Sequence, residues 1–305
     1  MEKDNHPMVS IIVPVFNGEN AIEECIQSLL DQDYPRDKYE IIIVDNNSKD
    51  GTGEIIKRYP VLYLLEDEIQ SSYAARNKGI GYAQGEIFAF TDSDCVASKN
   101  WLKEAMLLFK EDLVGCVTGE VYAYKPLTAV EKHLERSKEL SNKDKMFNGK
   151  MDCVPTCNAI YRRSIFEKIG LFDSTMKSGG DVDLAWRMHQ KTNYQIEFCP
   201  GAVVYHKHRA DLRSLWRQKV LYGYAHVVLY KKYRDNLGNH SFKDTCRHLK
   251  VLLGALKAIP KHWLKYLAGN SNTDDLIDAH LNFLKSLAYE VGRIKGSIKE
   301  RVWYL

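Results

Sequence analysis

The 305-residue sequence predicts an α/β protein with a mostly parallel central sheet, helices on both faces and an α-helical C-terminal extension. Three observations predict it. The first half alternates short apolar runs, typical of buried strands, with segments whose apolar residues recur at helical spacing. The final third shows helical spacing alone. Finally, the carboxylates Asp92 and Asp94 directly follow an apolar run, and ligands of such sheets bind outside the carboxyl ends of the strands.

The first half accounts for four strands and the helices between them. Near-continuous apolar runs, as in strands covered on both faces, predict strands at 9–15, 41–44, 61–65 and 87–91. Helical spacing predicts intervening helices at about 20–30, 52–59 and 72–83. Asn20 and Glu23 have the spacing of a capping box, and Ser72 suits a helix start. Asp45 and Asp92 should therefore share the edge where the parallel strands end.

The strand–helix rhythm loosens after about Gly119. We expect a polar loop around 142–150 and strands at 158–162 and 202–206. Helices are expected at 128–140 and 181–190, and a further helix should start at Ser164. From Leu212 onward the apolar residues form helical stripes, one of them over 251–259 and ended by Pro260, and another over 276–298. We therefore predict a first domain over residues 1–206 and a helical extension over 207–305.

Composition and cysteine usage bound the class of protein. The hydrophobic share of 45% and charged share of 27% are those of an ordinary globular protein. Seven scattered cysteines form no C-x-x-C pair, which gives no support to a zinc or redox motif. The N-terminal residues lack an apolar signal segment, and no apolar run approaches the ~18 residues of a membrane span. These features predict a cytoplasmic protein.

Charge is distributed unevenly along the chain. Residues 1–206 hold 24 Lys and Arg against 32 Asp and Glu, whereas residues 207–305 hold 19 against 8, giving net charges of −8 and +11. The basic extension suggests peripheral contact with the anionic inner face of a membrane, and Trp and Tyr in 212–234 suit such an interface. A solvated helical surface and ordinary helix packing remain alternatives. No motif for reading nucleic acid is present.

The pair Asp92 and Asp94 suggests a cation site at the end of the fourth strand. Carboxylate oxygens suit a hard divalent ion such as Mg²⁺, which proteins hold with one or two carboxylates together with substrate phosphates. Asp and Ser are also common in turns, so a solvated turn is the alternative for this pair taken alone.

Five segments, taken together and in order, resemble family 2 glycosyltransferases, which have the Rossmann-like GT-A fold. They are residues 12–17 (IVPVFN), 44–52 (VDNNSKDGT), 75–79 (ARNKG), 91–94 (TDSD) and 180–187 (GDVDLAWR). Each motif is weak alone, and the ordered set spans roughly two-thirds of the chain. The resemblance implies transfer of a sugar from a nucleotide diphosphate sugar, with inversion at the anomeric carbon.

The resemblance also implies a donor site. Asp45 matches the aspartate that binds the nucleobase, typically uracil, whose imide N–H a carboxylate can accept. Arg76 matches an arginine near the nucleotide that can engage phosphate, with a helix-surface ion pair as the alternative. The donor-binding set is completed by residues in or next to the motifs 12–17 and 91–94: Pro14, Val15, Phe16, Asn17, Glu19, Asp92 and Ser93. The donor is expected to be a UDP-sugar.

The remaining roles concern the metal and the base. Asp94 and Asp92 match the ligands of a Mn²⁺ or Mg²⁺ ion, and His206 matches a further ligand that favours Mn²⁺. A strand-end basic cluster is the alternative for His206. Asp181 matches the catalytic base, which takes the acceptor hydroxyl's proton, with a plain N-cap as the alternative. Asp183 and Arg187, four residues apart, suit a structural ion pair.

Three positions depart from the family pattern. Gly18 stands where many relatives carry Glu directly after the matching Asn, and the Glu follows here as Glu19. Gly180 precedes the base where relatives commonly carry Glu, and Cys157 stands where they commonly carry Gly. A positive φ at Cys157 would strain the backbone; otherwise its larger side chain reshapes the donor or acceptor pocket.

Two other functions stay open at this point. A nucleotidyltransferase would need a Gly-rich, basic loop after the first strand, and residues 14–19 have a single glycine and no lysine. A non-catalytic sugar-nucleotide-binding protein would bind the donor without turnover. The lack of G-x-G-x-x-G after the first strand argues against a Rossmann oxidoreductase. The acceptor (saccharide, lipid-linked or small molecule) and the oligomeric state do not follow from the sequence.

Overall fold

The computed structural model describes residues 6–143, 146–147, 150–151, 153–237 and 242–304. The chain divides into two compact units, the first made of Met1–Tyr124 and Lys138–Lys207 and the second of Lys125–Ser137 and His208–Leu305. The second unit thus takes in a short stretch that the sequence placed in the first domain, and the predicted domain division stays a prediction.

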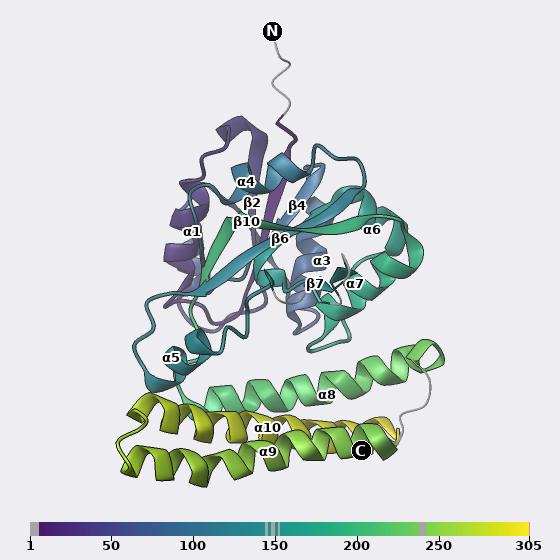
Figure 1. The fold of residues 1–305 in the computed structure, drawn as a ribbon. Helices are drawn as coiled ribbons and strands as arrows, with labels where there is room; N and C mark the ends of the chain where they lie inside the picture. Colours follow the sequence, from purple (N-terminus) through teal and green to yellow (C-terminus); the bar gives the residue numbers. More distant parts are fainter. Residues whose placement is uncertain (1–5, 144–145, 148–149, 152, 238–241, 305) are drawn as a thin grey trace. The chain divides into compact units, whose positions relative to one another are not determined.

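An eight-stranded sheet, in the order β3-β2-β1-β4-β9-β6-β10-β5, forms the first unit (Figure 1). The strands are β1 (Val9–Val15), β2 (Tyr39–Asp45), β3 (Leu62–Leu65), β4 (Ile87–Phe90), β5 (Cys95–Ala97), β6 (Val114–Ala123), β9 (Ala159–Arg162) and β10 (Gln195–His206). Only β9 and β5 run against the other six. This agrees with the predicted mostly parallel sheet and with the α/β class. A two-stranded hairpin, β7 (Met146–Phe147) and β8 (Lys150–Met151), falls in the expected loop.

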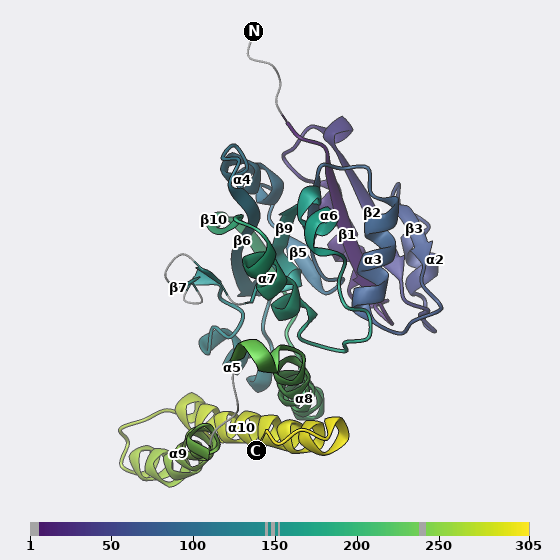
Figure 2. The ribbon, with the colours of Figure 1, turned by 90° about the vertical axis from the view of Figure 1, so that its right-hand side faces the viewer.

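Helices cover both faces of the sheet (Figure 2). They are α1 (Ile22–Leu30), α2 (Thr52–Ile56), α3 (Ser72–Tyr82), α4 (Trp101–Leu108), α6 (Arg163–Ile169) and α7 (Gly180–Lys191). Residues of α1 and α4 share one apolar core with alternate residues of β1, such as Ile11 and Val13. On the opposite face α3 comes so close to the sheet that a Cβ at Gly79 would lie 2.5 Å from a methyl of Ile12.

Several local predictions for the first unit were wrong. No side chain caps α1, whose N-cap is Ala21, because the preceding turn uses Gly18 O to accept the N–H groups of Ala21 and Ile22. Likewise no side chain caps α6. The cap of α3 is Ser71 rather than Ser72. The sequence analysis assigned no element to β5, α4 or β6, and the expected strand at 202–206 is only the last part of β10.

The second unit is helical and contains α5 (Ala129–Arg136), α8 (Leu212–Leu237), α9 (Phe242–Leu267) and α10 (Thr273–Glu300). The backbones of α8 and α10 approach closely at two glycines. A Cβ at Gly223 would lie 2.0 Å from the Tyr289 carbonyl oxygen, and one at Gly292 would lie 2.0 Å from that of Val220. Any side chain at either position would force these helices apart.

Three helix boundaries in this unit differ from the expectation. The helix α9 continues through Pro260, because α10 holds it on both sides of the proline: His248 contacts Glu290 before it, and Trp263 contacts His280 after it. The helix at 128–140 stops at Arg136, and α10 starts three residues early, at a capping box of Asn272 and Asp275. Within the described residues, no helix combines the length and apolarity needed to cross a membrane.

Candidate active site

The predicted donor-site residues lie along one edge of the sheet, where the parallel strands end. Parallel pairing sets Val15 opposite Asp45 in β1 and β2, and Ile12 opposite Phe90 in β1 and β4. Because the carboxyl ends of these parallel strands lie at the same edge, the turns that follow them are neighbours. The loop at Gly18 lies beside the acidic motif, since a Cβ there would be 3.6 Å from the Ser93 hydroxyl oxygen.

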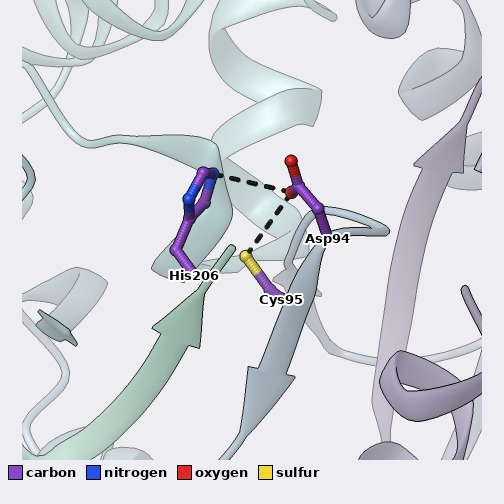
Figure 3. A group of neighbouring side chains, drawn as sticks. All are labelled: Asp94, Cys95 and His206. Carbon is purple, nitrogen blue, oxygen red and sulfur yellow. Dashed lines mark hydrogen bonds and ion pairs between the residues drawn. The ribbon is translucent and has the colours of Figure 1, made fainter. Parts of the chain in front are cut away.

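Strand pairing also brings His206 to the acidic motif. The last residue of β10, His206, pairs with Cys95, the first residue of β5, which directly follows Asp94. The His206 Nε2 atom lies 3.5 Å from Asp94 Oδ1, and the Cys95 thiol donates to the same oxygen (Figure 3). The Lys207 N–H also donates to the Asp94 carbonyl oxygen, at 2.8 Å.

The residues Asp94 and His206 have the chemistry and spacing of metal ligands. Ligand atoms of Asp94, Cys95 and His206 all lie within 4.8 Å of one another. Two ligands bound at ~2.1 Å to one ion lie roughly 3 to 3.5 Å apart, which matches the Asp94–His206 separation. Burial and the neighbouring Cys157 and Asp94 raise the pKa of the Cys95 thiol well above its usual range. This thiol therefore stays protonated, and the carboxylate–imidazole pair suits Mn²⁺.

The other carboxylate of the motif, Asp92, has a different partner. Its Oδ1 atom lies 2.5 Å from a terminal nitrogen of Arg76, a side chain on α3 that is almost fully buried. The alternative for Arg76 was an ion pair on the helix surface. It is wrong, because the Arg76 side chain is buried. The Arg76 Nε atom is buried and has no hydrogen-bond partner among the described residues. Arg76 thus neutralises Asp92 and keeps one donor unused.

The tyrosine Tyr73 connects this ion pair to the predicted base. It precedes Arg76 by nearly one turn of α3, and the guanidinium carbon lies 5.6 Å from its ring centroid. The Tyr73 hydroxyl accepts a hydrogen bond from the Gly180 N–H at 2.9 Å. A Cβ at Gly180 would lie 2.7 Å from the Tyr73 ring. The aromatic ring therefore fills the space of a residue-180 side chain, which explains the glycine there.

The predicted base, Asp181, is the second residue of α7 rather than its N-cap, which is Gly179. Its Oδ1 accepts from the Val182 N–H at 3.0 Å, and its Oδ2 accepts from the Cys153 thiol at 3.5 Å. Burial among protein atoms raises the pKa of Asp181, although these hydrogen bonds and Arg76 act in the opposite sense. A carboxylate with a raised pKa holds a proton more readily, as a general base requires.

The neighbouring Asp183 has the structural role that its spacing predicted. It is fully buried and lies 2.8 Å from Arg187. The same guanidinium donates to the carbonyl oxygens of Ile169 and Leu171. These bonds tie α7 to the end of α6.

The predicted base-binding residue, Asp45, lies at the end of β2 and is almost fully buried. Its Oδ1 accepts from the Ser48 N–H at 2.9 Å, and its Oδ2 accepts from the Tyr63 hydroxyl at 3.1 Å. Burial and the Asp45 charge raise the pKa of Tyr63 to about 12. The tyrosine therefore remains a donor to Asp45 at neutral pH. Each carboxylate oxygen can accept a further bond.

The segment 14–19 separates into supporting and exposed residues. Pro14 and Val15 lie buried within β1, whereas Phe16 is 51% exposed at the strand end. Asn17 joins two loops: its N–H donates to the Ser48 hydroxyl, and its side-chain oxygen accepts from the Lys49 N–H. Glu19 accepts from the Gly51 N–H at 2.9 Å, so its carboxylate braces this turn.

The backbone at Cys157 answers the question that the sequence raised. This residue lies in a short 3₁₀ turn and is absent from the described non-glycine residues with positive φ. The strained-backbone interpretation is therefore wrong. The buried Cys157 carbonyl accepts from the Thr91 hydroxyl at 2.9 Å, which ties this turn to the strand end before the acidic motif.

Four residues around the site were not predicted from the sequence: Tyr63, Tyr73, Cys95 and Cys153. Tyr73 had a usable signal, because residues three apart on a helix share a face with each other and Arg76 was already a candidate. Cys95 also had one, since it directly follows Asp94. Tyr63 and Cys153 come to the site only through tertiary structure.

Comparison with known proteins gives consistent relatives. The model of the family described as glycosyl transferase family 2 matches residues 10–170. Glycosyltransferase AglE of Haloferax volcanii is 35% identical over 210 residues, which are 67% of this chain and 68% of that protein. Probable glycosyltransferase YdaM of Bacillus subtilis is 26% identical over 73% of this chain and 56% of its own length. The chain thus spans little more than half of the second relative.

Two solved structures share the fold. Mannosyltransferase PcManGT from Pyrobaculum calidifontis, in complex with GDP-Man and Mn²⁺, gives a TM-score of 0.67 at 20% identity, over 97% of this chain and 89% of that one. TarS residues 1–349 from S. aureus, in complex with UDP, gives 0.52 at 18% identity, over 98% and 93%. At such low sequence identity, the likeness to these structures shows only that the chain has the GT-A fold. The family match and the 35% identical relative show that this chain belongs to glycosyl transferase family 2.

Proposed function

We propose that this family 2 glycosyltransferase moves a sugar from a UDP-sugar to an acceptor hydroxyl, with inversion and with a divalent metal ion. The supporting observation is the chain of contacts from Asp92 through Arg76 and Tyr73 to Gly180, next to Asp181. This chain joins the acidic motif to the candidate base, although the two are far apart in sequence.

The candidate base is Asp181. An inverting displacement needs a group opposite the leaving diphosphate that takes the acceptor hydroxyl's proton. Burial raises the pKa of Asp181 and so increases its affinity for that proton. The Cys153 thiol and the Val182 N–H orient the carboxylate.

Asp94 and His206 would hold the metal ion, and Asp92 would lie beside them, paired with Arg76. A bound ion would neutralise charge that builds on the leaving diphosphate. The Arg76 guanidinium holds Asp92 in a fixed position, which suits a carboxylate that hydrogen-bonds the donor rather than one that binds the ion directly.

Asp45 would select the nucleobase. Its carboxylate is oriented by Tyr63 and Ser48 and can accept the imide N–H of uracil. Guanine also presents N–H donors, so a GDP-sugar is the competing donor. The exposed ring of Phe16, at the end of the neighbouring strand, offers a surface for the base.

The test is a donor screen with the purified chain, Mn²⁺ and a panel of UDP- and GDP-sugars, with release of the nucleoside diphosphate as the readout. We expect slow UDP release without acceptor and loss of that release in EDTA. NMR of the product would give the anomeric configuration. Failure to bind any nucleotide sugar, or full activity in Asp94→Ala, would contradict the proposal.

The same preparations separate the other functions. Release of pyrophosphate from UTP and a sugar 1-phosphate would indicate a nucleotidyltransferase. Unchanged donor affinity in Asp181→Asn without turnover in either form would indicate a binding protein. A saccharide, a lipid-linked or a small-molecule acceptor is to be sought once the donor is known.

A further inference from the structure

The helix α9 of the second unit carries an exposed apolar line, which we call the α9 stripe. Six of its side chains are large and apolar, with exposed fractions from 43% at Trp263 to 75% at Leu267; they are Leu249, Leu253, Leu256, Trp263, Leu264 and Leu267. Apart from the adjacent pair Trp263 and Leu264, they are three, four or seven residues apart, which puts them on one side of the helix. Pro260 lies on the same line and is also exposed.

The adjoining side of α9 faces α10, and Trp263 lies where this side meets the stripe. His248 lies 3.4 Å from Glu290, and the Trp263 ring lies 6.3 Å from that of His280. Leu252 and Ile259, on this side, are partly buried. The two helices run side by side in both views (Figures 1 and 2). Leucines of the α9 stripe therefore remain open although the helix already has a partner.

From residue 246 to its end, α9 carries charge of a single sign. Residues 246–267 contain no Asp or Glu. Four exposed lysines (Lys250, Lys257, Lys261 and Lys265) line one flank of the stripe. An apolar face bordered by lysines is the pattern of helices that lie in a membrane interface, where long lysine side chains reach the anionic headgroups.

The aromatic segment 212–234, which the sequence analysis considered for membrane contact, fits this role less well. Tyr230 and Tyr233 are buried, as are Leu215 and Val227. Packing within the helical unit thus accounts for many of its apolar side chains. Leu212 and Tyr222 are exposed in this segment, but α9 exposes more large apolar side chains.

We propose that the α9 stripe docks on an anionic lipid membrane, with the helix axis in the plane of the surface. The leucines and Trp263 would enter the boundary between headgroups and acyl chains, and the lysine flank would pair with lipid phosphates. A second copy of the chain fits less well, because antiparallel pairing of two such stripes would bring their lysine flanks together. This binding does not depend on the donor or the reaction.

The test is flotation of the full chain with vesicles of phosphatidylcholine alone or mixed with phosphatidylglycerol, at low and high salt. We expect binding to the mixed vesicles at low salt, weakened by salt. The double variant Leu253→Glu/Leu264→Glu should lose at least about tenfold in lipid affinity, as should Lys257→Glu/Lys261→Glu. Leu113→Glu and Lys110→Glu, exposed in the first unit, are matched controls and should bind as wild type.

Fluorescence gives an independent readout. Because Trp303 is 76% exposed, the measurement is made in a Trp303→Phe background. Brominated lipid should quench the tryptophan emission of this protein, and the further change Trp263→Phe should remove most of that quenching, whereas the buried Trp101 stays unquenched. Circular dichroism and donor hydrolysis of each variant check the fold. Wild-type protein that never floats, or stripe variants that float like wild type, would overturn the proposal. So would a solution dimer that Leu253→Glu dissociates while vesicles remain unbound.

Discussion

Each unit of this enzyme contains an ionisable side chain whose charge is disfavoured by burial, and the two have different surroundings. In the first unit, burial raises the pKa of Asp181. In the second, burial and the nearby Lys285 lower the pKa of Lys219, on α8, to about 7. Judged by direction of shift alone, both would be candidates for catalysis.

Asp181 and Lys219 differ in their contacts. Asp181 is partly exposed, accepts two hydrogen bonds, and lies next to a residue that Tyr73 holds. Lys219 is 5% exposed, and its ammonium group lies 4.9 Å from the Tyr222 ring centroid. A shifted pKa therefore indicates a site only where the group is reachable. The following predictions test this contrast, from the largest expected effect downward.

Asp181→Asn should lower kcat by about a thousandfold, because an amide cannot take the acceptor's proton. In the wild type, kcat/KM should fall as pH drops through the raised pKa of Asp181, since only the ionised carboxylate is a base. This decline should start at a higher pH than for an ordinary aspartate and vanish from the variant's residual activity. Asp112→Asn, at an exposed position, is the control.

Asp94→Ala should lower activity roughly a hundredfold or more, because the ion would lose its carboxylate ligand. Raising Mn²⁺ should recover part of the loss. Titration of Mn²⁺ against activity checks this, with the exposed Asp67→Ala as control. Equal Mn²⁺ dependence in wild type and variant would remove Asp94 from the ion's ligands.

Below pH 7, Lys219→Met should raise the free energy of unfolding by about 2 kcal/mol and leave activity unchanged, because burial disfavours the charged form of Lys219. Between pH 7 and 10 the unfolded chain binds more protons at Lys219 than the folded chain does. The wild type therefore gains stability as pH rises, and the variant's advantage should be largest below pH 7 and shrink above it. Urea unfolding at several pH values measures this. The exposed Lys110→Met should show no such trend.

Tyr73→Phe should have the smallest effect, about a tenfold loss in kcat with little change in the KM for donor. It removes the acceptor of the Gly180 N–H and so loosens the start of α7 without touching substrate. A pH profile of kcat separates this positioning role from a loss of fold. If Tyr73 positions Asp181, the part of the profile that reports the ionisation of Asp181 should shift along the pH axis. Tyr82→Phe, 56% exposed on the same helix, is the control.

The sequence predicted the first unit well wherever a buried strand ends in a polar turn. Asp45 and Asp92 were placed at a shared edge because apolar runs mark parallel strands and fix where they stop. It did not predict the long paired strands β6 and β10. In β10, Pro200 and Gly201 break the apolar run. It also missed Tyr63 and Cys153, since nothing local ties them to Asp45 or Asp181.

In the second unit, helical spacing identified helices but not what covers them. Val251 and Leu256, assigned to a buried stripe, are 60% and 45% exposed. Amphipathic spacing predicts that one face of a helix avoids water, and it cannot tell a neighbouring helix from a lipid surface. Pro260 shows the same limit, because contacts with α10 hold α9 together where the local sequence favours an end.

The pairing of Arg76 with Asp92 has a consequence for the order in which ligands load. One of the two carboxylates is already compensated by Arg76, so without a donor the site offers a cation little more than the single charge of Asp94. A diphosphate would add the negative charge that is missing. We therefore expect Mn²⁺ to bind weakly by itself and much more tightly with UDP, a synergy that calorimetric titration of each ligand in the presence and absence of the other would measure.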